Sequence, residues 1–494
     1  MLLQEIIAGI PDIELRGDIL DSIQGISYDS RTVEPGDLFV AMKGVKTDGA
    51  RHVQQAKEKG AAAIASEQPV ALDSGVTFLK VTDARKFLAQ ASHAFFQDPT
   101  SQLKLVGITG TNGKTTTSYL VESVFRQAGL KSCLLGTIGM KIGDAPYPSK
   151  HTTPEAPDLL RFLRQAVNEG VSHGALEVSS HALALKRVYG CKITIGVFSN
   201  LTPDHLDFHQ DMESYYQAKR LLFVEEGNNR VETAVINTDD PYGERLAQEA
   251  SCPVLRYGFG PQAGVRAIET SSHTDRTKLR VATPLGDLHI TSSLLGRPNT
   301  YNILAATSAA LGLGLDPNTI QDGIEALKAV AGRMELIECG QPFTVLVDYA
   351  HTQDALKKIL ETIAQLPHRK IITVFGCGGD RDRTKRPAMG FAAGSLSDLV
   401  IATSDNPRTE DPRQILAEIE DGLMKGKALY TLIVDRRAAI REALSLAAEG
   451  DVVLIAGKGH EQYQVLGTKV IPFDDRTVAG EILRELAADR GRRN

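Results

Sequence analysis

The sequence has few cysteines, no long apolar run and no excess of basic residues, and each shortage excludes a class of protein. The cysteines are odd in number, widely scattered and without any CxxC spacing: Cys133, Cys191, Cys252, Cys339 and Cys377. A disulfide framework or a structural zinc site is therefore not expected. This usage fits a reducing compartment, so we expect a cytoplasmic protein.

The chain also lacks the features of membrane and nucleic-acid proteins. No segment offers the roughly 18 consecutive apolar residues that a membrane-spanning helix needs. The first fifteen residues carry Glu5, Asp12 and Glu14 without a basic region or an apolar run, which is unlike a signal peptide. The net charge of −6 provides no global field for nucleic acid or an anionic membrane. An anionic substrate would have to be held by local basic groups and backbone N–H groups.

The length and the hydrophobic pattern indicate several α/β domains. At 494 residues the chain is long enough for about three domains, and no internal repeat or low-complexity tract interrupts it. Short apolar runs alternate with amphipathic helical stretches, which is typical of parallel α/β sheets. We predict a small α/β N-terminal domain over residues 1–100 and a central, P-loop ATPase-like parallel sheet over 101–331. A doubly wound, Rossmann-like C-terminal domain is predicted over 332–494.

Eleven short apolar runs are predicted to be strands. They are Asp37–Ala41, Ala61–Ala65, Leu103–Ile108, Ala175–Val178, Ile193–Phe198, Ala234–Ile236, Phe343–Val347, Ile371–Phe375, Leu399–Thr403, Leu432–Val434 and Val452–Ala456. Between Gly264 and Thr291 the pattern becomes alternating and Thr-rich, which predicts an antiparallel ribbon. Polar clusters follow several strands of the third block, where doubly wound sheets bind their ligands.

The most informative local motif is a glycine-containing loop between a predicted buried strand and a predicted helix. It comprises Thr109, Gly110, Thr111, Asn112, Gly113, Lys114, Thr115 and Thr116. The two glycines let the backbone turn so that N–H groups point at phosphate oxygens, Lys114 would place a charge on the β- and γ-phosphates, and Thr115 would offer its hydroxyl to Mg²⁺. The strict GxxxxGK pattern fails at Ile108, and a chance turn is the alternative. The position between strand and helix favours a nucleoside triphosphate site.

Several motifs resemble one known family. The glycine loop resembles the ATP loop of the Mur ligases, which build the peptidoglycan stem peptide. Five further segments agree, in order along the chain: Leu176–Leu183, Asn200–His209, Asp348–Thr352, Gly376–Asp382 and Asp405–Arg408. The last two narrow the resemblance to the members that add meso-diaminopimelate to UDP-N-acetylmuramoyl-L-alanyl-D-glutamate. The resemblance covers essentially the whole chain.

This resemblance implies an ATP-dependent, amide-bond-forming ligase. The N-terminal domain would hold the UDP end of the substrate, the central domain would bind ATP, and the C-terminal domain would bring the amino acid. The D-glutamate γ-carboxylate would be phosphorylated to an acyl phosphate, the amine of diaminopimelate would attack it, and phosphate would leave. Such an enzyme serves peptidoglycan synthesis, and with it cell wall biogenesis, cell shape, cell division and the cell cycle. We expect a monomer that uses Mg²⁺, binds no nucleic acid and does not insert into membranes.

Four residues are expected at a magnesium site. Glu177 follows a predicted strand, where a carboxylate can hold Mg²⁺ beside Thr115, although an ordinary loop carboxylate is the alternative. The resemblance implies His205 as a ligand of a second metal ion. It also implies that Lys219 becomes a metal ligand after its amine captures CO₂ as a carbamate. Without the resemblance, Lys219 would be interpreted as a solvated lysine and His205 as a structural histidine. The resemblance gives Lys114, His205 and Lys219 the catalytic roles.

The resemblance also implies contacts to the two larger substrates. For ATP these include Arg333, Asp348 and His351 in the third block, together with Asn299 and Asn302, whose alternative role is helix capping. For the UDP-linked substrate they are Ser30, Arg31, Lys43, Gly44, Thr152, Thr153, Ser179, His181 and Arg187.

The choice of amino acid is expected to depend on one arginine. Diaminopimelate differs from lysine by a second, distal carboxylate, and the planar fork of an arginine suits that group. Arg408 follows a predicted strand, and binding lysine would leave it unpaired at a cost of roughly 1–3 kcal/mol. In isolation this segment would be interpreted as a turn with a solvated arginine. The resemblance adds further contacts at Arg381, Asp405, Asn406, Pro407, Gly457 and Glu461, with Glu461 taking the distal ammonium group.

Two other activities stay open on the sequence. A lysine-adding or folylpolyglutamate-type ligase of the same superfamily would share the ATP loop and the activation of a carboxylate. A P-loop nucleotide switch would hydrolyse ATP without any small amine. A ligase, by contrast, should release phosphate only when both co-substrates are present.

Overall fold

The computed structural model describes residues 1–44, 48–70, 75–149, 151–273 and 275–493. Its contacts divide the chain into two compact units, each made of two stretches of sequence. The first comprises Met1–Arg266 and Leu304–Gly323, and the second comprises Ala267–Ile303 and Ile324–Asn494. The chain is α/β, as predicted. Among the described residues, no helix combines the length and the apolar character needed to cross a membrane.

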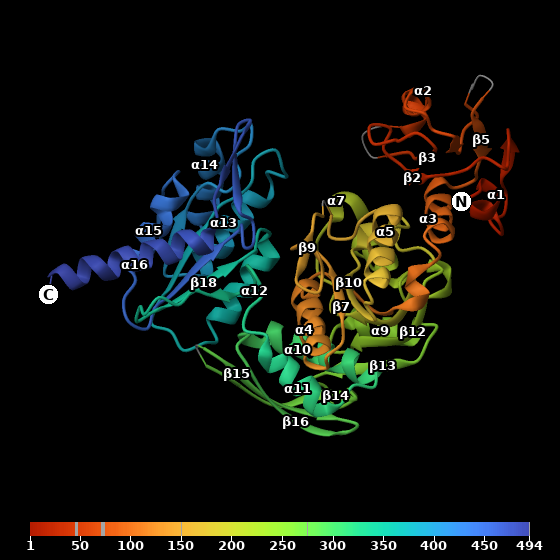
Figure 1. Ribbon diagram of the computed structural model, residues 1–494. Coiled ribbons are helices and arrows are strands. Elements are labelled where there is room, and N and C mark those ends of the chain that lie inside the picture. Colours follow the sequence, from red (N-terminus) through yellow and green to blue (C-terminus); the bar gives the residue numbers. More distant parts are fainter. Residues whose placement is uncertain (45–47, 71–74, 150, 274, 494) are drawn as a thin grey trace. The chain divides into compact units, whose positions relative to one another are not determined.

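The N-terminal part of the first unit is a five-stranded sheet in the order β1-β5-β4-β3-β2. Its strands are β1 (Glu14–Arg16), β2 (Gly25–Ser27), β3 (Asp37–Ala41), β4 (Ala63–Ser66) and β5 (Thr77–Lys80). All are parallel except β1 at the edge. Leu38 and Val40 of β3 pack with α1 (Leu3–Ile7) and α3 (Ala84–Phe95), whereas Phe39 packs with α2 (Val53–Glu58), so helices cover both faces (Figure 1).

The central sheet of the first unit carries the glycine loop. Its parallel strands are β6 (Lys104–Thr109), β7 (Ser132–Leu135), β10 (His173–Glu177), β11 (Lys192–Phe198), β12 (Arg230–Asn237) and β13 (Val254–Gly258). Two short strands, β8 (Met140–Ile142) and β9 (Ala145–Tyr147), extend one side in antiparallel fashion. β6 lies between β10 and β11, and Leu105, Val106 and Ile108 are buried. The loop therefore leaves the sheet from a central strand.

Helices surround this central sheet and connect its strands. They are α4 (Lys114–Gln127), α5 (Ala156–Asn168), α6 (Ser180–Ala184), α7 (Leu206–His209), α8 (Met212–Arg220), α9 (Pro241–Glu249) and α11 (Pro317–Ala326). α10 (Gly296–Gly312) comes directly before α11 in the sequence. α11 packs closely on α4, because the Ser123 hydroxyl donates to the Gly323 carbonyl at 2.6 Å. A Cβ atom at Gly323 would come within 2.6 Å of the Val124 Cα atom.

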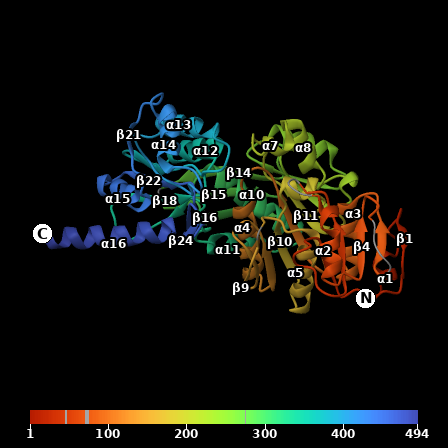
Figure 2. The ribbon, with the colours of Figure 1, turned by 90° about the horizontal axis from the view of Figure 1, so that it is seen from above.

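The second unit contains a six-stranded sheet in the order β17-β18-β22-β19-β20-β21. Its strands are β17 (Glu335–Leu336), β18 (Thr344–Asp348), β19 (Ile371–Phe375), β20 (Leu399–Ala402), β21 (Leu429–Leu432) and β22 (Val452–Ala456), parallel except for β17. Successive residues of each strand face opposite sides. One face packs against α12 (Gln353–Ile363), α13 (Lys385–Leu396) and α14 (Pro412–Leu423). The other packs against α15 (Arg436–Leu446) and α16 (Asp475–Arg493), which confirms the doubly wound arrangement (Figure 2).

All but one of the predicted strands agree with the observed ones, with small shifts at their ends. Ile371–Phe375 and Val452–Ala456 match β19 and β22. The ribbon predicted after Gly264 corresponds to β14 (Val265–Ser272), β15 (Thr277–Thr283) and β16 (Gly286–Ser292), and β15 and β16 pair antiparallel. The strand predicted at Leu432–Val434 is wrong in its bounds, since β21 begins at the exposed Leu429. An edge strand with alternating burial has no continuous apolar run to mark it.

Candidate nucleotide and amino-acid sites

The glycine loop turns through two residues that need left-handed backbone conformations. Gly110 has a φ of +145° and Gly113 a φ of +90°, and Gly113 caps the N-terminus of α4. A Cβ atom at Gly110 would lie 1.9 Å from the Oγ atom of Ser199, the residue that follows β11. Glycine is therefore required at 110 both by conformation and by space. The loop opens onto the N-terminal end of a 14-residue helix, where backbone N–H groups favour an anion.

The segment after β11 fixes the shape of this loop. Thr111 N donates to Asn200 O at 2.8 Å, Asn112 N donates to Asn200 Oδ1 at 3.1 Å, and Asn200 Nδ2 donates back to Asn112 O at 3.1 Å. The Ser199 hydroxyl also donates to Asn112 O at 2.6 Å. The loop is thus shaped by the protein itself before any ligand binds. From the sequence, Asn200 is only the first residue of one family motif, and no role is predicted for it.

Two lysine amino groups converge on the loop. Lys114 Nζ donates to the carbonyls of Gly110 and Thr111, both at 2.9 Å, and Lys219 Nζ from α8 donates to the same Gly110 carbonyl at 2.8 Å. Lys219 is 1% exposed and lies 4.6 Å above the Tyr215 ring. Burial, and then the charge of Lys114, holds the pKa of Lys219 well below its usual value. The interpretation of Lys219 as a solvated lysine is therefore wrong, because the lysine is in the core.

A buried carboxylate lies beside the first residues of α4. Glu177, at the end of β10, is 0% exposed and accepts hydrogen bonds from Thr115 Oγ1 at 3.1 Å, Thr137 N at 2.9 Å and Thr137 Oγ1 at 3.0 Å. Gly136 leaves room for it, since a Cβ atom there would lie 2.1 Å from Glu177 Oε1. Within the described ranges, no lysine, arginine or histidine forms an ion pair with Glu177. A buried carboxylate without a protein cation is a suitable partner for a metal ion.

Three histidines pack together between α6 and α7. The ring of His181 lies 4.8 Å from that of His205 and 5.5 Å from that of His209, and His209 Nε2 contacts Ser180 Oγ at 2.9 Å. Burial lowers the pKa of His205, and it lowers the pKa of His181 and His209 to about 4. The rings are therefore neutral near pH 7. His205 has a φ of +53°, a backbone conformation that residues other than glycine rarely adopt.

Of the four residues predicted to hold metal ions, only Glu177 and His205 have side chains that commonly bind metal ions without modification. Thr115 contacts Glu177, whereas Lys219 contacts the loop carbonyl of Gly110. Across the part of the chain that the structure describes, no group of three or more His, Cys, Asp or Glu side chains is arranged to hold a metal ion. The predicted set has one carboxylate and one histidine, so a hydroxyl, a modified lysine or ATP itself would have to complete it.

Four of the residues assigned to the UDP-linked substrate surround Glu177. The Thr153 hydroxyl donates to the Glu177 backbone carbonyl at 2.7 Å and lies 3.4 Å from Ser179 Oγ. Arg187 Nη1 donates to Thr153 O at 2.9 Å, and Thr152 Oγ1 lies 3.1 Å from Thr137 Oγ1. The structure thus gathers these residues beside the buried carboxylate.

Of the five other assigned residues, four follow β2 and β3 in the N-terminal sheet, and His181 lies in α6. Ser30 donates to Gln55 Oε1 at 2.7 Å, and Arg31 pairs with Asp29 at 2.7 Å. Lys43 and Gly44 come two and three residues after β3. Since β2 and β3 are parallel neighbours, both segments lie at the same end of the sheet.

In the second unit, Arg333, Asp348 and His351 lie around one tyrosine. The Arg333 guanidinium lies 4.8 Å from the Tyr349 ring centre, and the His351 ring lies 4.5 Å from the same ring. Asp348 accepts from Met334 N and Ala350 N, both at 2.8 Å, and burial raises the pKa of this carboxyl. On α10, Asn302 Nδ2 donates to Asn299 Oδ1 at 3.0 Å, and Asn299 donates to Leu295 O.

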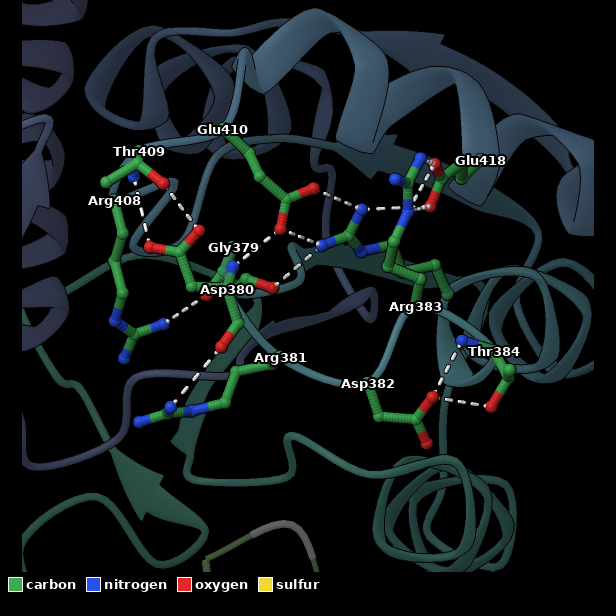
Figure 3. Close-up of polar contacts among 12 residues, drawn as sticks. Gly379, Asp380, Arg381, Asp382, Arg383, Thr384, Arg408, Thr409, Glu410 and Glu418 are labelled. Atoms are coloured by element: carbon green, nitrogen blue, oxygen red, sulfur yellow. Dashed lines mark hydrogen bonds and ion pairs between the residues drawn. The ribbon is translucent and has the colours of Figure 1, made fainter. Parts of the chain in front are cut away.

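The residues assigned to the amino acid lie at the carboxyl ends of β19, β20 and β22. Arg408 Nη1 donates to Gly379 O at 2.7 Å, and the Arg381 guanidinium contacts Asp380 O at 3.4 Å (Figure 3). Among the described residues, no carboxylate forms an ion pair with either arginine. Gly457, with a φ of +113°, lies beside Asp405, since a Cβ atom there would be 3.1 Å from Asp405 Oδ2.

A buried lysine that the sequence did not reveal holds Glu461. Lys458 is 0% exposed, and its Nζ atom donates to Glu461 Oε2 at 3.0 Å and to Asn406 Oδ1 at 3.3 Å. Asn406 Nδ2 donates to the same carboxylate at 2.9 Å, and Asn406 Oδ1 also accepts from Val465 N. Asn406 is 2% exposed, so much of its hydrogen-bonding capacity is already used within the protein. The burial of Lys458 has no signal in the sequence.

The first unit therefore carries a glycine loop of a shape that suits a phosphate group, and the second carries a cluster of charged and polar groups at the carboxyl ends of its strands. Three family descriptions match the chain: "Mur ligase family, catalytic domain" over residues 22–96, "Mur ligase middle domain" over 108–310 and "Mur ligase, glutamate ligase domain" over 332–459. The chain belongs to the Mur ligase family.

Individual relatives match over nearly the full length. The UDP-N-acetylmuramoyl-L-alanyl-D-glutamate--2,6-diaminopimelate ligase of Geobacter metallireducens is 47% identical, with 99% of both chains covered. The protein of the same name from Geobacillus thermodenitrificans is 45% identical, with 98% of this chain and 100% of that one covered. A solved structure of a protein with this name is 34% identical, covers 99% of both chains and has a TM-score of 0.71.

Proposed function

We propose that the protein is an ATP-dependent ligase that joins meso-diaminopimelate to the D-glutamate γ-carboxylate of UDP-N-acetylmuramoyl-L-alanyl-D-glutamate in peptidoglycan precursor synthesis. The observation that carries this proposal is the full-length, 47% identity to a ligase of that name. Residues 1–100 would bind the UDP end, residues 101–331 ATP and residues 332–494 the amino acid. The γ-phosphoryl group of ATP passes to the carboxylate, and the amine of diaminopimelate displaces phosphate from the acyl phosphate.

The glycine loop holds the triphosphate in this mechanism. The N–H groups at the start of α4 and the Lys114 ammonium group face the developing negative charge. Because Asn200 already fixes the loop by hydrogen bonds to Thr111 and Asn112, little ordering is left to be done on binding. Asn299, Asn302, Arg333, Asp348 and His351 supply the remaining ATP contacts.

The groups beside the loop fit a hard divalent cation. Mg²⁺ supplies a positive charge that stabilises the transferring phosphoryl group. Thr115 and Glu177 would hold one Mg²⁺ through oxygen atoms, which Mg²⁺ prefers, and His205 with a carbamylated Lys219 would help to hold a second. Lys219 suits carbamylation, because burial lowers the pKa of its amine and so favours the unprotonated form, which can attack CO₂ with loss of a proton. The product is an anion, which would attract the Lys114 ammonium group.

The amino-acid end requires groups for two carboxylates and for the ammonium that does not react. The guanidinium groups of Arg381 and Arg408 can each form hydrogen bonds with a carboxylate, and the Glu461 carboxylate can pair with the distal ammonium group. Lysine lacks the distal carboxylate and would leave Arg408 unpaired, at roughly 1–3 kcal/mol.

The decisive experiment is phosphate release with each substrate omitted in turn. The purified protein should release phosphate only with ATP, the UDP-linked dipeptide and diaminopimelate together. Phosphate release without an amine would instead favour a nucleotide switch. Arg408→Ala should raise the KM for diaminopimelate about tenfold or more while sparing that for ATP. Equal use of lysine by the unmodified protein would contradict the assignment of Arg408.

A further inference from the structure

The Arg408 guanidinium is held by a second loop that belongs to a different strand. Gly379 N donates to Asn406 O at 2.9 Å, and Arg408 Nη1 donates back to Gly379 O. The next residue, Thr409, donates to the Asp380 carboxylate through its hydroxyl at 2.7 Å and its N–H at 3.2 Å (Figure 3). The loop after β19 and the loop after β20 are thus joined residue by residue.

Both loops contain a residue in an uncommon backbone conformation. Arg408 has a φ of +51° and Asp380 a φ of +53°. Neither is a glycine, so each conformation persists only because its surroundings impose it. The contact is also sterically close, because a Cβ atom at Gly379 would lie 1.9 Å from Pro407 O. The direction in which Arg408 leaves the backbone therefore depends on the bonds between the loops.

A fully buried arginine anchors the contact between the two loops. Arg386 of α13 is 0% exposed and donates to both oxygens of Glu410 at 2.8 and 2.9 Å, to Glu418 at 2.9 Å and to Gly378 O at 3.3 Å. Glu410 in turn accepts Asp380 N at 2.5 Å. Arg386 lowers the pKa of the Glu410 carboxyl to about 2, so Glu410 remains an anion at neutral pH. Glu410 therefore connects the buried arginine to the backbone N–H of Asp380, and Thr409 joins the Asp380 carboxylate to the loop after β20.

We propose that Thr409 and Glu410, anchored by Arg386, are positioning residues that aim Arg408 and so set the affinity and selectivity for an amino acid with a second, distal carboxylate. This inference rests on the proposed function. None of the three residues is required to touch the substrate, because each acts through contacts within and between the two loops. Losing them should weaken binding of the distal carboxylate and leave the nucleotide step intact.

Thr409→Val is the sharpest test, because it removes one exposed hydroxyl with little change of shape. It should raise the KM for diaminopimelate severalfold with little change in kcat or in the KM for ATP. The matched control is Thr384→Val, since the Thr384 hydroxyl is also exposed and donates at 2.6 Å to Asp382, but within a single loop. The control should leave all three constants unchanged.

Glu410→Gln tests the anchor itself and should raise the same KM by about tenfold to a hundredfold, the range for losing a hydrogen bond to a charged group. It should also lower the preference for diaminopimelate over lysine, because lysine makes no use of Arg408. Hydrogen exchange at the Asp380 amide should accelerate in this variant. A purely structural role would lower thermal stability without changing the preference between the two amino acids.

The outcomes separate the inference from the proposed function. If the unmodified protein ligates diaminopimelate, and Thr409→Val and Glu410→Gln keep its KM and its preference over lysine, the inference is wrong and the proposed function stands. If the unmodified protein releases no phosphate with diaminopimelate, both are wrong, since no amino-acid site would then exist for Thr409 and Glu410 to position.

Discussion

The buried carboxylate of Glu177 allows stability and activity to be separated by one substitution. In Glu177→Gln the side chain keeps its shape, and its amide oxygen can still accept the Thr137 N–H that is now 2.9 Å from Oε1. The hydroxyls of Thr115 and Thr137, at 3.1 and 3.0 Å from Oε2, can rotate and accept from the new amide NH₂. Since no buried polar atom is left without a partner, the free energy of unfolding should change by about 1 kcal/mol or less.

Activity should respond far more strongly than stability. The substitution removes a unit charge from the site that would hold Mg²⁺, and two unit charges about 4 Å apart interact by about 4 kcal/mol at an effective dielectric constant of about 20. At about 1.4 kcal/mol per decade, we expect ATP-dependent phosphate release to fall by about 100-fold to 1000-fold. Urea unfolding gives the first quantity, and phosphate release at increasing Mg²⁺ concentration gives the second.

Another buried carboxylate, which lies on α4, provides the control. Glu122 is 5% exposed and pairs with Lys141 at 3.1 Å and Arg126 at 3.2 Å. Glu122→Gln leaves two cations without a carboxylate, so it should lower stability more than Glu177→Gln does while turnover stays close to normal. Wild-type turnover in Glu177→Gln, with an unchanged dependence on Mg²⁺, would refute the assignment of Glu177.

Three further results are expected. Lys219→Ala should lose most ligation, and a short carboxylic acid should restore part of it by replacing the carbamate; an inactive protein that no acid restores would weigh against the carbamate. Gly110→Ala should destabilise the protein by about 1–3 kcal/mol more than Gly139→Ala in urea unfolding, because Gly110 is crowded and Gly139, with a similar φ of +151°, has no atom within 4 Å of its Cβ position; equal losses would show that conformation alone matters. The pKa of His181 and His209 falls from 6.5 to about 4 on folding, so between pH 6.5 and 4 the unfolded chain gains protons that the folded chain does not, and stability should decrease as the pH falls through this window. His209→Gln should flatten the urea midpoint over that window, and an unchanged slope would contradict the burial argument.

The sequence predicted what depends on local pattern. The buried strands of both parallel sheets, the glycine loop and the ribbon after Gly264 all have a periodicity or a composition that neighbouring residues reveal. Short strands such as β1, β8 and β17 were not predicted, because two or three residues carry no period. Their pairing is decided by the sheet edge that accepts them.

The site was predictable in its membership and not in its electrostatics. The resemblance named Lys219 and Glu461, but their environments arise from residues distant in sequence. Lys219 is buried against Gly110, 109 positions away, and Glu461 shares the amide of Asn406, 55 positions away. Arg386 and Lys458, both fully buried, look like ordinary surface residues in a linear sequence. Only the fold shows that their charges are enclosed.

The close packing of α11 on α4 has a consequence for how the protein is made. The first compact unit is completed by Leu304–Gly323, after the chain has contributed Ala267–Ile303 to the second unit. During synthesis, the face of α4 that carries Ser123 and Val124 therefore stays uncovered until Gly323 has left the ribosome. A fragment that stops at Arg266 would leave this face of α4 exposed, so the smallest nucleotide-binding piece expected to fold alone extends to Gly323.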